Sequence, residues 1–109
     1  MRIVIKATNL DLTPPLKAYI DKKIGSLQKY LVRFEEEAEV KVEVEVARTT
    51  KHHHKGNVFY AEANARLLDT ILRAEESAPD IRKAIDVVRQ TLEREISKYK
   101  EKKVDRRSQ

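Results

Sequence analysis

The chain has 109 residues, with 23 Lys and Arg against 18 Asp and Glu, and no cysteine. This length fits a single domain with a modest core, and the absence of cysteine excludes disulfides, thiolate metal sites and cysteine catalysis. Every uncharged run is too short to cross a membrane, and the opening residues are too polar for a signal peptide. We therefore expect a soluble cytoplasmic protein.

The charge is unevenly distributed along the chain. Residues 1–34 carry seven basic and two acidic residues, residues 35–48 carry two and six, and residues 77–109 carry ten and six. The two basic segments are also the two predicted helices described below. Clustered cationic helices favour a polyanionic partner, nucleic acid first and an acidic membrane surface second. Composition alone leaves open the alternative that high charge only keeps a small protein soluble.

The first half of the chain predicts a strand, a helix and a second strand. Residues 2–8 form a short β-branched run that is typical of a strand. Over residues 13–34, Thr13 is a suitable N-cap and Pro14 a suitable first helical residue. One apolar face of this predicted helix is formed by Leu16, Ile20, Ile24, Leu27 and Leu31. Residues 38–48 then alternate valine with charged residues, which predicts a strand with one buried face and one wet, mostly acidic face.

The second half predicts two more strands and a final helix. Residues 58–67 alternate as a third strand, and residues 70–76 form a fourth. Residues 77–103 predict a helix in which Ser77 and Asp80 resemble a capping box. The order β-α-β-β-β-α predicts an α+β two-layer sandwich, with a four-stranded sheet and two helices on one face. We expect one domain over residues 1–103 and a short flexible basic tail over residues 104–109.

Three consecutive histidines, His52, His53 and His54, lie in the predicted connection between the second and third strands. A zinc site needs three or four ligands that converge, usually from separate elements, and adjacent residues in a turn do not converge without help. An internal run of three is also unlike a purification tag. We therefore interpret this segment as a polar hairpin tip that gains positive charge below neutral pH, and we expect no metal and no cofactor.

Signals for catalysis are weak throughout the chain. Its two glycines cannot form a glycine-rich phosphate loop, and none of its serines sits in a strained elbow near a histidine. The carboxylates of Glu43, Glu45 and Glu62 are expected on an open sheet face without an apolar pocket to raise their pKa. We therefore predict a protein that is not an enzyme and has no small-molecule substrate.

The basic helix faces are the candidate binding surface. On the first predicted helix, Lys22, Ser26, Lys29 and Arg33 form one stripe, and Lys23 borders it. On the last helix the flanks carry Lys83, Arg94 and Lys98 on one side and Arg82, Arg89 and Lys100 on the other, interrupted by Asp86, Glu93 and Glu101. Such stripes would follow an RNA backbone by shape and charge, although ordinary solvated helix surfaces show the same pattern. Exposed aromatic residues are scarce, which argues against stacking on single-stranded bases.

Two long segments of the chain resemble one known family. "ATNLDLTPPLKAYIDKKIGSLQKYL" near the start and "LRAEESAPDIRKAIDVVRQTLEREISKYK" near the end resemble the ribosome hibernation-promoting factors, also called ribosome-associated inhibitor A or protein Y. The resemblance covers residues 1–103 and implies the same sandwich fold, which is similar to double-stranded RNA-binding domains. It also implies binding to the small ribosomal subunit and its rRNA in the tRNA and mRNA channel, where the domain inhibits translation and stabilises idle ribosomes under stress.

The resemblance transfers to some residues and not to others. By position, Lys22, Lys23 and Lys29 match family lysines, and Arg94, Lys98 and Lys100 match basic positions on the last helix. Ser26 stands where a lysine is common and Arg82 where a tyrosine is usual. Long members continue into a dimerising domain, which we expect this short form to lack. Two alternatives remain: a free-standing RNA-binding or RNA-chaperone module, and a protein-interaction domain that uses the open sheet face.

Overall fold

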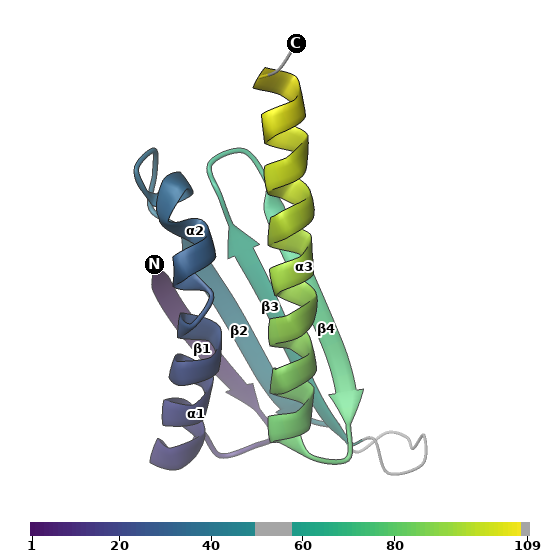
Figure 1. Ribbon diagram of the computed structural model, residues 1–109. Coiled ribbons are helices and arrows are strands. Elements are labelled where there is room, and N and C mark those ends of the chain that lie inside the picture. Colours follow the sequence, from purple (N-terminus) through teal and green to yellow (C-terminus); the bar gives the residue numbers. More distant parts are fainter. Residues whose placement is uncertain (50–57, 108–109) are drawn as a thin grey trace.

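The computed structural model describes residues 1–49 and 58–107, the last four by their backbone only. It contains a four-stranded mixed sheet with three helices on one of its faces (Figure 1). The elements in chain order are β1 (Arg2–Thr8), α1 (Pro14–Gly25), α2 (Gln28–Glu35), β2 (Lys41–Arg48), β3 (Phe59–Arg66), β4 (Ile71–Ala78) and α3 (Ile81–Arg107). The predicted α+β two-layer sandwich is confirmed.

The sheet order is β1-β2-β3-β4, so every neighbour in space is also a neighbour in sequence. β1 and β2 are parallel, which requires a crossover connection, and α1 and α2 supply it across one face. The other two pairs are antiparallel. In this register Ile5, Val44, Ala63 and Ala74 lie side by side across the sheet. The alternating positions therefore form one continuous apolar surface under the helices.

The core lies between that surface and the helices. Ile20, Ile24 and Leu31 from α1 and α2 and Leu92 and Ile96 from α3 are completely buried. The alanines of β3, at positions 61, 63 and 65, are also buried, and such small side chains let a helix lie close to the sheet. Figure 1 shows α1 and α2 following one line, with α3 running beside them over β3 and β4. This arrangement places the two basic helical segments next to each other.

The helix predicted over residues 13–34 is wrong in one respect, because the structure divides it at Ser26 and Leu27. Two bonds at the break, Leu27 N–H to the Ile24 carbonyl and Tyr30 N–H to the Leu27 carbonyl, span three residues instead of four. Gly25 is a weak helix former, and the Ser26 hydroxyl donates to the Lys23 carbonyl at 2.6 Å. Leu27 stays fully buried, so the apolar pattern continues across the break.

The start of the last helix also differs from the prediction. Ser77 lies inside β4, where it is paired with Tyr60, so it does not cap the helix. Asp80 takes that place: its Oδ1 accepts from the Arg82 N–H at 3.1 Å, and its carbonyl accepts from the Ala84 N–H at 3.1 Å. At the other end the helix runs to Arg107, past residue 104, where the tail was expected to begin. The domain boundary itself stays a prediction.

The open face of the sheet is not mostly acidic as predicted. Arg66 pairs with Glu43, and Arg73 lies 3.0 Å from Glu62 and 2.9 Å from Glu75. The Tyr60 hydroxyl lies 2.6 Å from both Glu62 and Glu75 and can donate its one hydrogen to either, which holds their pKa below the usual range, and the Arg66 guanidinium does the same for Glu43. These carboxylates therefore stay ionised near neutral pH and sit among compensating cations.

Candidate nucleic-acid interface

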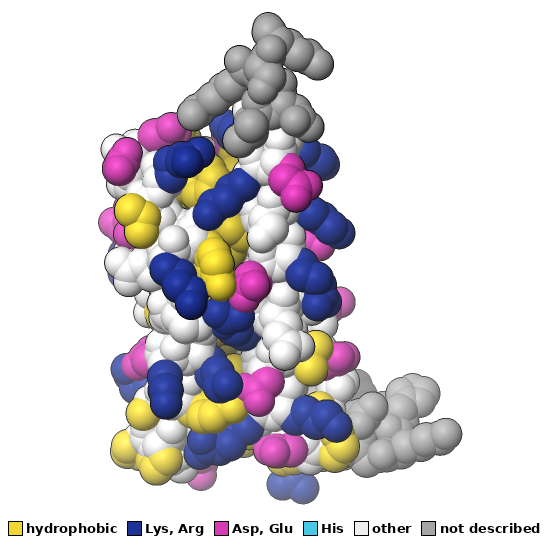
Figure 2. All heavy atoms as spheres, viewed as in Figure 1, with side chains coloured by type: hydrophobic (Ala, Val, Ile, Leu, Met, Phe, Trp, Pro, Cys, Tyr) yellow, Lys and Arg dark blue, Asp and Glu magenta, His cyan; other side chains and the backbone are white. Residues whose placement is uncertain are grey.

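The line along which α1 and α2 meet α3 is rich in cations. We call this surface the basic seam and define it by nine residues: Tyr19, Lys22, Lys23, Lys29, Tyr30, Arg33, Arg82, Arg89 and Lys100. Figure 2 shows dark-blue Lys and Arg side chains gathered along this line, with hydrophobic side chains among them. Residues far apart in the sequence form this surface because α1 and α2 lie beside α3 on the same face of the sheet.

At one end of the basic seam, the Tyr19 ring lies between two cations. The Arg82 guanidinium is 4.6 Å and the Lys23 ammonium 5.6 Å from the ring centroid, within the range of cation–π attraction. The Tyr19 hydroxyl donates to Asp86 Oδ1 at 2.5 Å, and Lys23 Nζ is 3.5 Å from the same oxygen. This hydrogen bond, burial and the Asp86 charge raise the pKa of Tyr19 to about 12. Asp86 thus offsets part of the positive charge here.

At the other end, the Tyr30 ring has three cations around it. Lys29 Nζ is 5.3 Å, Lys100 Nζ 5.7 Å and the Arg89 guanidinium carbon 5.9 Å from the ring centroid. Lys29 comes from α2, whereas Arg89 and Lys100 are separated by three turns of α3. The ring is half-buried and Lys29 is exposed. The cations are therefore positioned by the ring while Lys29 remains accessible.

Arg89 connects α3 with the segment between α1 and α2. Its Nε donates to Ser26 Oγ at 3.0 Å, and its Nη1 pairs with Glu93 one turn further along α3. Only 19% of its side chain is exposed. A guanidinium held by three partners has little freedom to follow a ligand. Arg89 is thus mainly a structural residue of the seam, whereas exposed Lys22, Lys29 and Arg33 are free to approach phosphates.

Three predicted site residues lie outside the basic seam. Lys83, Arg94 and Lys98 are all exposed on α3. Arg94 donates to Thr91 Oγ1 at 3.2 Å, and Lys98 lies 3.8 Å from Glu95, so both contact α3 itself. The two flanks of α3 are therefore separate in the structure, and of the two only the flank with Arg82, Arg89 and Lys100 lies next to α1 and α2. A role of the other flank in RNA binding stays a prediction.

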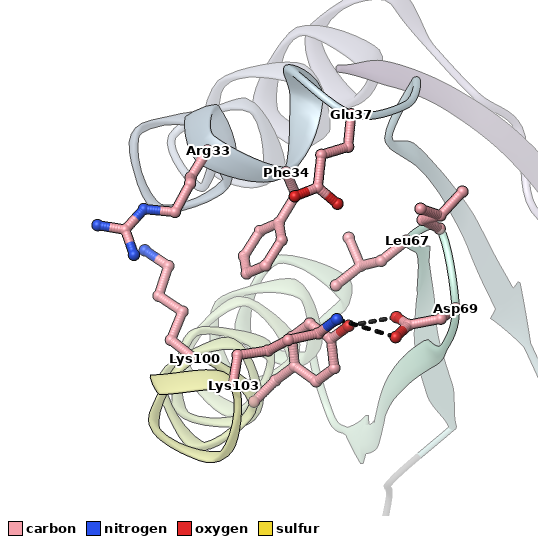
Figure 3. Close-up of a pocket in the computed structure, with 9 residues that line it drawn as sticks. Arg33, Phe34, Glu37, Leu67, Asp69, Lys100 and Lys103 are labelled. Carbon is pink, nitrogen blue, oxygen red and sulfur yellow. Dashed lines mark hydrogen bonds and ion pairs between the residues drawn. The ribbon is translucent and has the colours of Figure 1, made fainter. Parts of the chain in front are cut away.

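A small hollow lies next to the Arg33 and Lys100 end of the seam (Figure 3). The Phe34 and Tyr99 rings, 5.4 Å apart, form one wall, and the turn between β3 and β4 forms the other. Asp69 in that turn accepts from the Tyr99 hydroxyl and from Lys103 Nζ at 3.0 Å, which holds its pKa below the usual range. The cavity volume is about 30 Å³, enough for one or two water molecules. The contacts of Asp69 with Tyr99 and Lys103 hold α3 against the turn between β3 and β4. The hollow is too small for a nucleotide.

Within the described part of the chain, no three or more His, Cys, Asp or Glu residues are grouped so that they could hold a metal ion. The predicted hairpin tip with His52, His53 and His54 lies outside the described residues, so its interpretation as a polar loop stays a prediction. No described helix is both long enough and apolar enough to span a bilayer.

The comparison with known proteins gives a family. Residues 3–104 match the family described as "Sigma 54 modulation protein / S30EA ribosomal protein". The chain belongs to this family. Among its relatives are proteins named ribosome hibernation promotion factor: that of Lactococcus lactis is 35% identical over 88% of this chain, and that of Bacillus subtilis 31% identical over 94%. The chain spans about half the length of these relatives, 48% and 50% respectively.

Solved structures of S30EA-type domains have the same fold. The protein Y N-terminal domain of Thermus thermophilus is 25% identical, with a TM-score of 0.72 over 91% of this chain and 99% of that one. A ribosomal subunit interface protein from Coxiella burnetii has a TM-score of 0.73 at 23% identity, over 92% of this chain and 98% of that one. The resemblance inferred from the two sequence segments is thereby confirmed at the level of family and fold.

Sequence reasoning missed the aromatic part of the basic seam. It counted few exposed aromatics and did not connect Tyr19 and Tyr30 with the cations. Steps of four and three residues do place Tyr19, Lys23, Ser26 and Tyr30 on one line, which is the local signal for their alignment. Their partners Arg82, Arg89 and Lys100 lie more than fifty residues away, beyond the reach of helical periodicity.

Proposed function

We propose that this chain is a ribosome-binding translation inhibitor that stabilises idle ribosomes under stress. In this proposal the domain occupies the tRNA and mRNA channel of the small subunit and contacts rRNA through the basic seam. The observation that carries it is the convergence of Lys22, Lys29 and Arg33 with the α3 cations on a single face. The names of the relatives, ribosome hibernation promotion factor and ribosomal subunit interface protein, support the same function.

The two faces of the domain differ in charge in a way that favours one-sided binding to RNA. On the open sheet face, Arg66 and Arg73 are paired with Glu43, Glu62 and Glu75. On the helical face, Lys22, Lys29, Arg33 and Arg82 of the basic seam are exposed. Phosphate contacts supply most sequence-independent affinity for nucleic acid, so the helical face is the one expected to approach rRNA.

The geometry suits recognition of RNA by backbone and shape. The Phe34 and Tyr99 rings contact each other, and Tyr19 and Tyr30 have cations beside them, so these rings already have partners within the protein. Sequence-tolerant binding to folded RNA uses phosphate and 2′-hydroxyl contacts instead of base stacking. A structured ribosomal channel, crowded with phosphates on several sides, is such a target.

Co-sedimentation with purified small subunits tests the proposal. We expect stable association with subunits that lack tRNA and mRNA, and release when both are added in excess. An in vitro translation assay should show inhibition that the same competitors relieve. A short RNA duplex serves as the second target. Comparable affinity for the duplex, with no competition by tRNA and mRNA, would favour the free-standing RNA-binding module instead.

The salt dependence tests the electrostatic part of the proposal separately. If about five phosphates are contacted, the logarithm of the binding constant should fall with the logarithm of salt concentration with a slope of roughly 3.5 to 4.5. A salt-independent affinity would contradict binding through the basic seam. Binding that survives but moves to the open sheet face in cross-linking would favour a protein-interaction domain.

A further inference from the structure

The Tyr30 ring gathers cations from two helices that the sequence keeps far apart. Lys29, Arg89 and Lys100 all lie between 5.3 and 5.9 Å from its centroid. Like charges brought this close repel one another, and each lysine loses rotamer freedom when its ammonium group is held in place. The negative face of an aromatic ring offsets part of this repulsion. A leucine at position 30 could bury similar area but could not offset it.

We propose that Tyr30 is a positioning residue that fixes the spacing of the phosphate-binding cations before RNA arrives. This inference rests on the proposed function and assigns one side chain a role within it. Arg89 is the anchor of the group because Ser26 and Glu93 also hold it. Lys29 and Lys100 are the members whose ammonium groups keep hydrogen-bond donors for phosphates. Holding them in place reduces the ordering cost of binding, which strengthens affinity without adding a contact.

Tyr19 does not have the same role at the other end of the seam. Its hydroxyl donates to Asp86, and Asp86 also neutralises Lys23 at 3.5 Å. A phosphate approaching Lys23 therefore meets a carboxylate nearby. Around Tyr30 there are three cations, and Glu93 is paired with Arg89. The uncompensated positive charge is thus greater at the Tyr30 end.

This role predicts a change in affinity without a change in the number of ionic contacts. The salt slope reports how many phosphates are neutralised, and replacing Tyr30 leaves every cation present. Loss of three cation–π contacts, each weak at a partly exposed site, is expected to weaken binding about tenfold. A lysine substitution behaves differently, because it lowers the slope by about one contact as well as the affinity.

The experiment compares the parent with Tyr30→Leu and Tyr30→Phe for binding to purified small subunits over a range of salt concentrations. We expect Tyr30→Leu to bind about tenfold more weakly with an unchanged slope, and Tyr30→Phe to bind like the parent because it keeps the ring. Parental affinity for Tyr30→Leu would overturn the inference. A reduced slope for Tyr30→Leu, or an equal loss for Tyr30→Phe, would also overturn it.

A measurement without ribosomes separates this inference from the proposed function. In the parent, ring currents from Tyr30 should shift the ε-methylene NMR signals of Lys29 and Lys100 upfield, and Tyr30→Leu should remove the shift. Absence of the shift in the parent overturns the inference, even where Tyr30→Leu fails to fold. If the shift is present and the parent does not bind small subunits, the proposed function fails. The positioning role is then tested by the same salt series on a short RNA duplex.

Discussion

Arg89 on α3 donates a hydrogen bond from Nε to Ser26 Oγ, 3.0 Å away, at the break between α1 and α2. The Ser26 hydroxyl also donates to the Lys23 carbonyl at 2.6 Å, so it bonds on both sides. The Ser26 side chain therefore links α1 with α3 at the centre of the basic seam. A lysine at position 26, which the family resemblance suggests, would place a further cation beside Arg89. It would also leave the Arg89 Nε without this acceptor.

Ser26→Lys is expected to lower the stability of the fold and to add one ionic contact with RNA. Losing the hydrogen bond to Arg89 and adding a like charge should lower the free energy of unfolding by about 0.5–1.5 kcal/mol. The added cation should steepen the salt slope of small-subunit binding by roughly 0.7–0.9. Urea unfolding and salt-dependent binding measure the two effects. Ser26→Ala is the control: it loses the bond but should keep the parental slope. A fully stable Ser26→Lys protein would show that the Arg89 bond contributes nothing.

Lys22→Gln combined with Lys29→Gln tests the helical face as the binding face. Both side chains are exposed, so the stability of the fold should change by less than about 0.5 kcal/mol. Removing two phosphate contacts should reduce the salt slope by about two and weaken binding to small subunits at physiological salt at least tenfold. Sedimentation binding over a salt series checks both quantities.

The matched control for that pair is Lys6→Gln combined with Lys41→Gln on the open sheet face. It removes the same net charge from the opposite side of the molecule, at paired strands β1 and β2. Affinity and slope should stay near the parental values apart from a small long-range effect of net charge. Equal losses for the two pairs would mean that net charge alone governs binding. A larger loss of affinity for the sheet pair would mean that the open sheet face, and not the helical face, binds the small subunit.

The sequence was sufficient for the architecture because the pattern of each element is strong. Residues 2–8 read as a strand and are β1, and the valine alternation over residues 38–48 contains β2. The break in the first helix escaped prediction for a physical reason. The three-residue step from Ile24 to Leu27 and the four-residue step from Leu27 to Leu31 both continue the helical pattern, so periodicity alone cannot distinguish one helix from two that share an apolar face.

The predictions about surface charge were wrong or incomplete for a different reason, because the pairing of charges depends on contacts between residues that are far apart in the sequence. The open face was judged from β2, whose outward residues are mostly acidic, whereas Arg66 and Arg73 come from β3 and β4. Register between strands fixes those pairings, and a single strand does not contain that information. The basic seam was predicted in part, as stripes on two helices. Which flank of α3 joins the first stripe depends on how α3 is rotated over the sheet.

Gly25→Ala is expected to stabilise the protein. An added Cβ would meet its nearest partner, Ile3 Cδ1, at 4.0 Å, an ordinary van der Waals distance. Alanine favours helix over glycine by up to about 1 kcal/mol, so we expect a gain of about 0.4–1 kcal/mol in the free energy of unfolding. Chemical denaturation measures it. Ala18→Gly, at an exposed position of α1, should lower stability by a similar amount. A loss of stability in Gly25→Ala would show that the break itself needs glycine.

Alkaline pH should weaken the fold partly through Tyr19, whose pKa is raised to about 12 by its hydrogen bond to Asp86, by burial and by the Asp86 charge. The folded protein holds this proton more tightly than the unfolded chain, whose tyrosines titrate near pH 10. The stabilising contribution is therefore fully present below about pH 10 and is lost as pH rises to about 12.

Asp86→Asn tests this assignment, because it removes the carboxylate that raises the pKa while keeping a hydrogen-bond acceptor. The Tyr19 ¹³Cζ signal should then titrate closer to pH 10 than in the parent, and stability should decline less over that window. Tyr19→Phe, compared with the parent, isolates the Tyr19 part of the alkaline decline from that of the other tyrosines and the lysines. An unchanged Tyr19 titration in Asp86→Asn would mean that burial, and not Asp86, raises its pKa. The same variant removes the carboxylate beside Lys23, so its affinity for small subunits should rise.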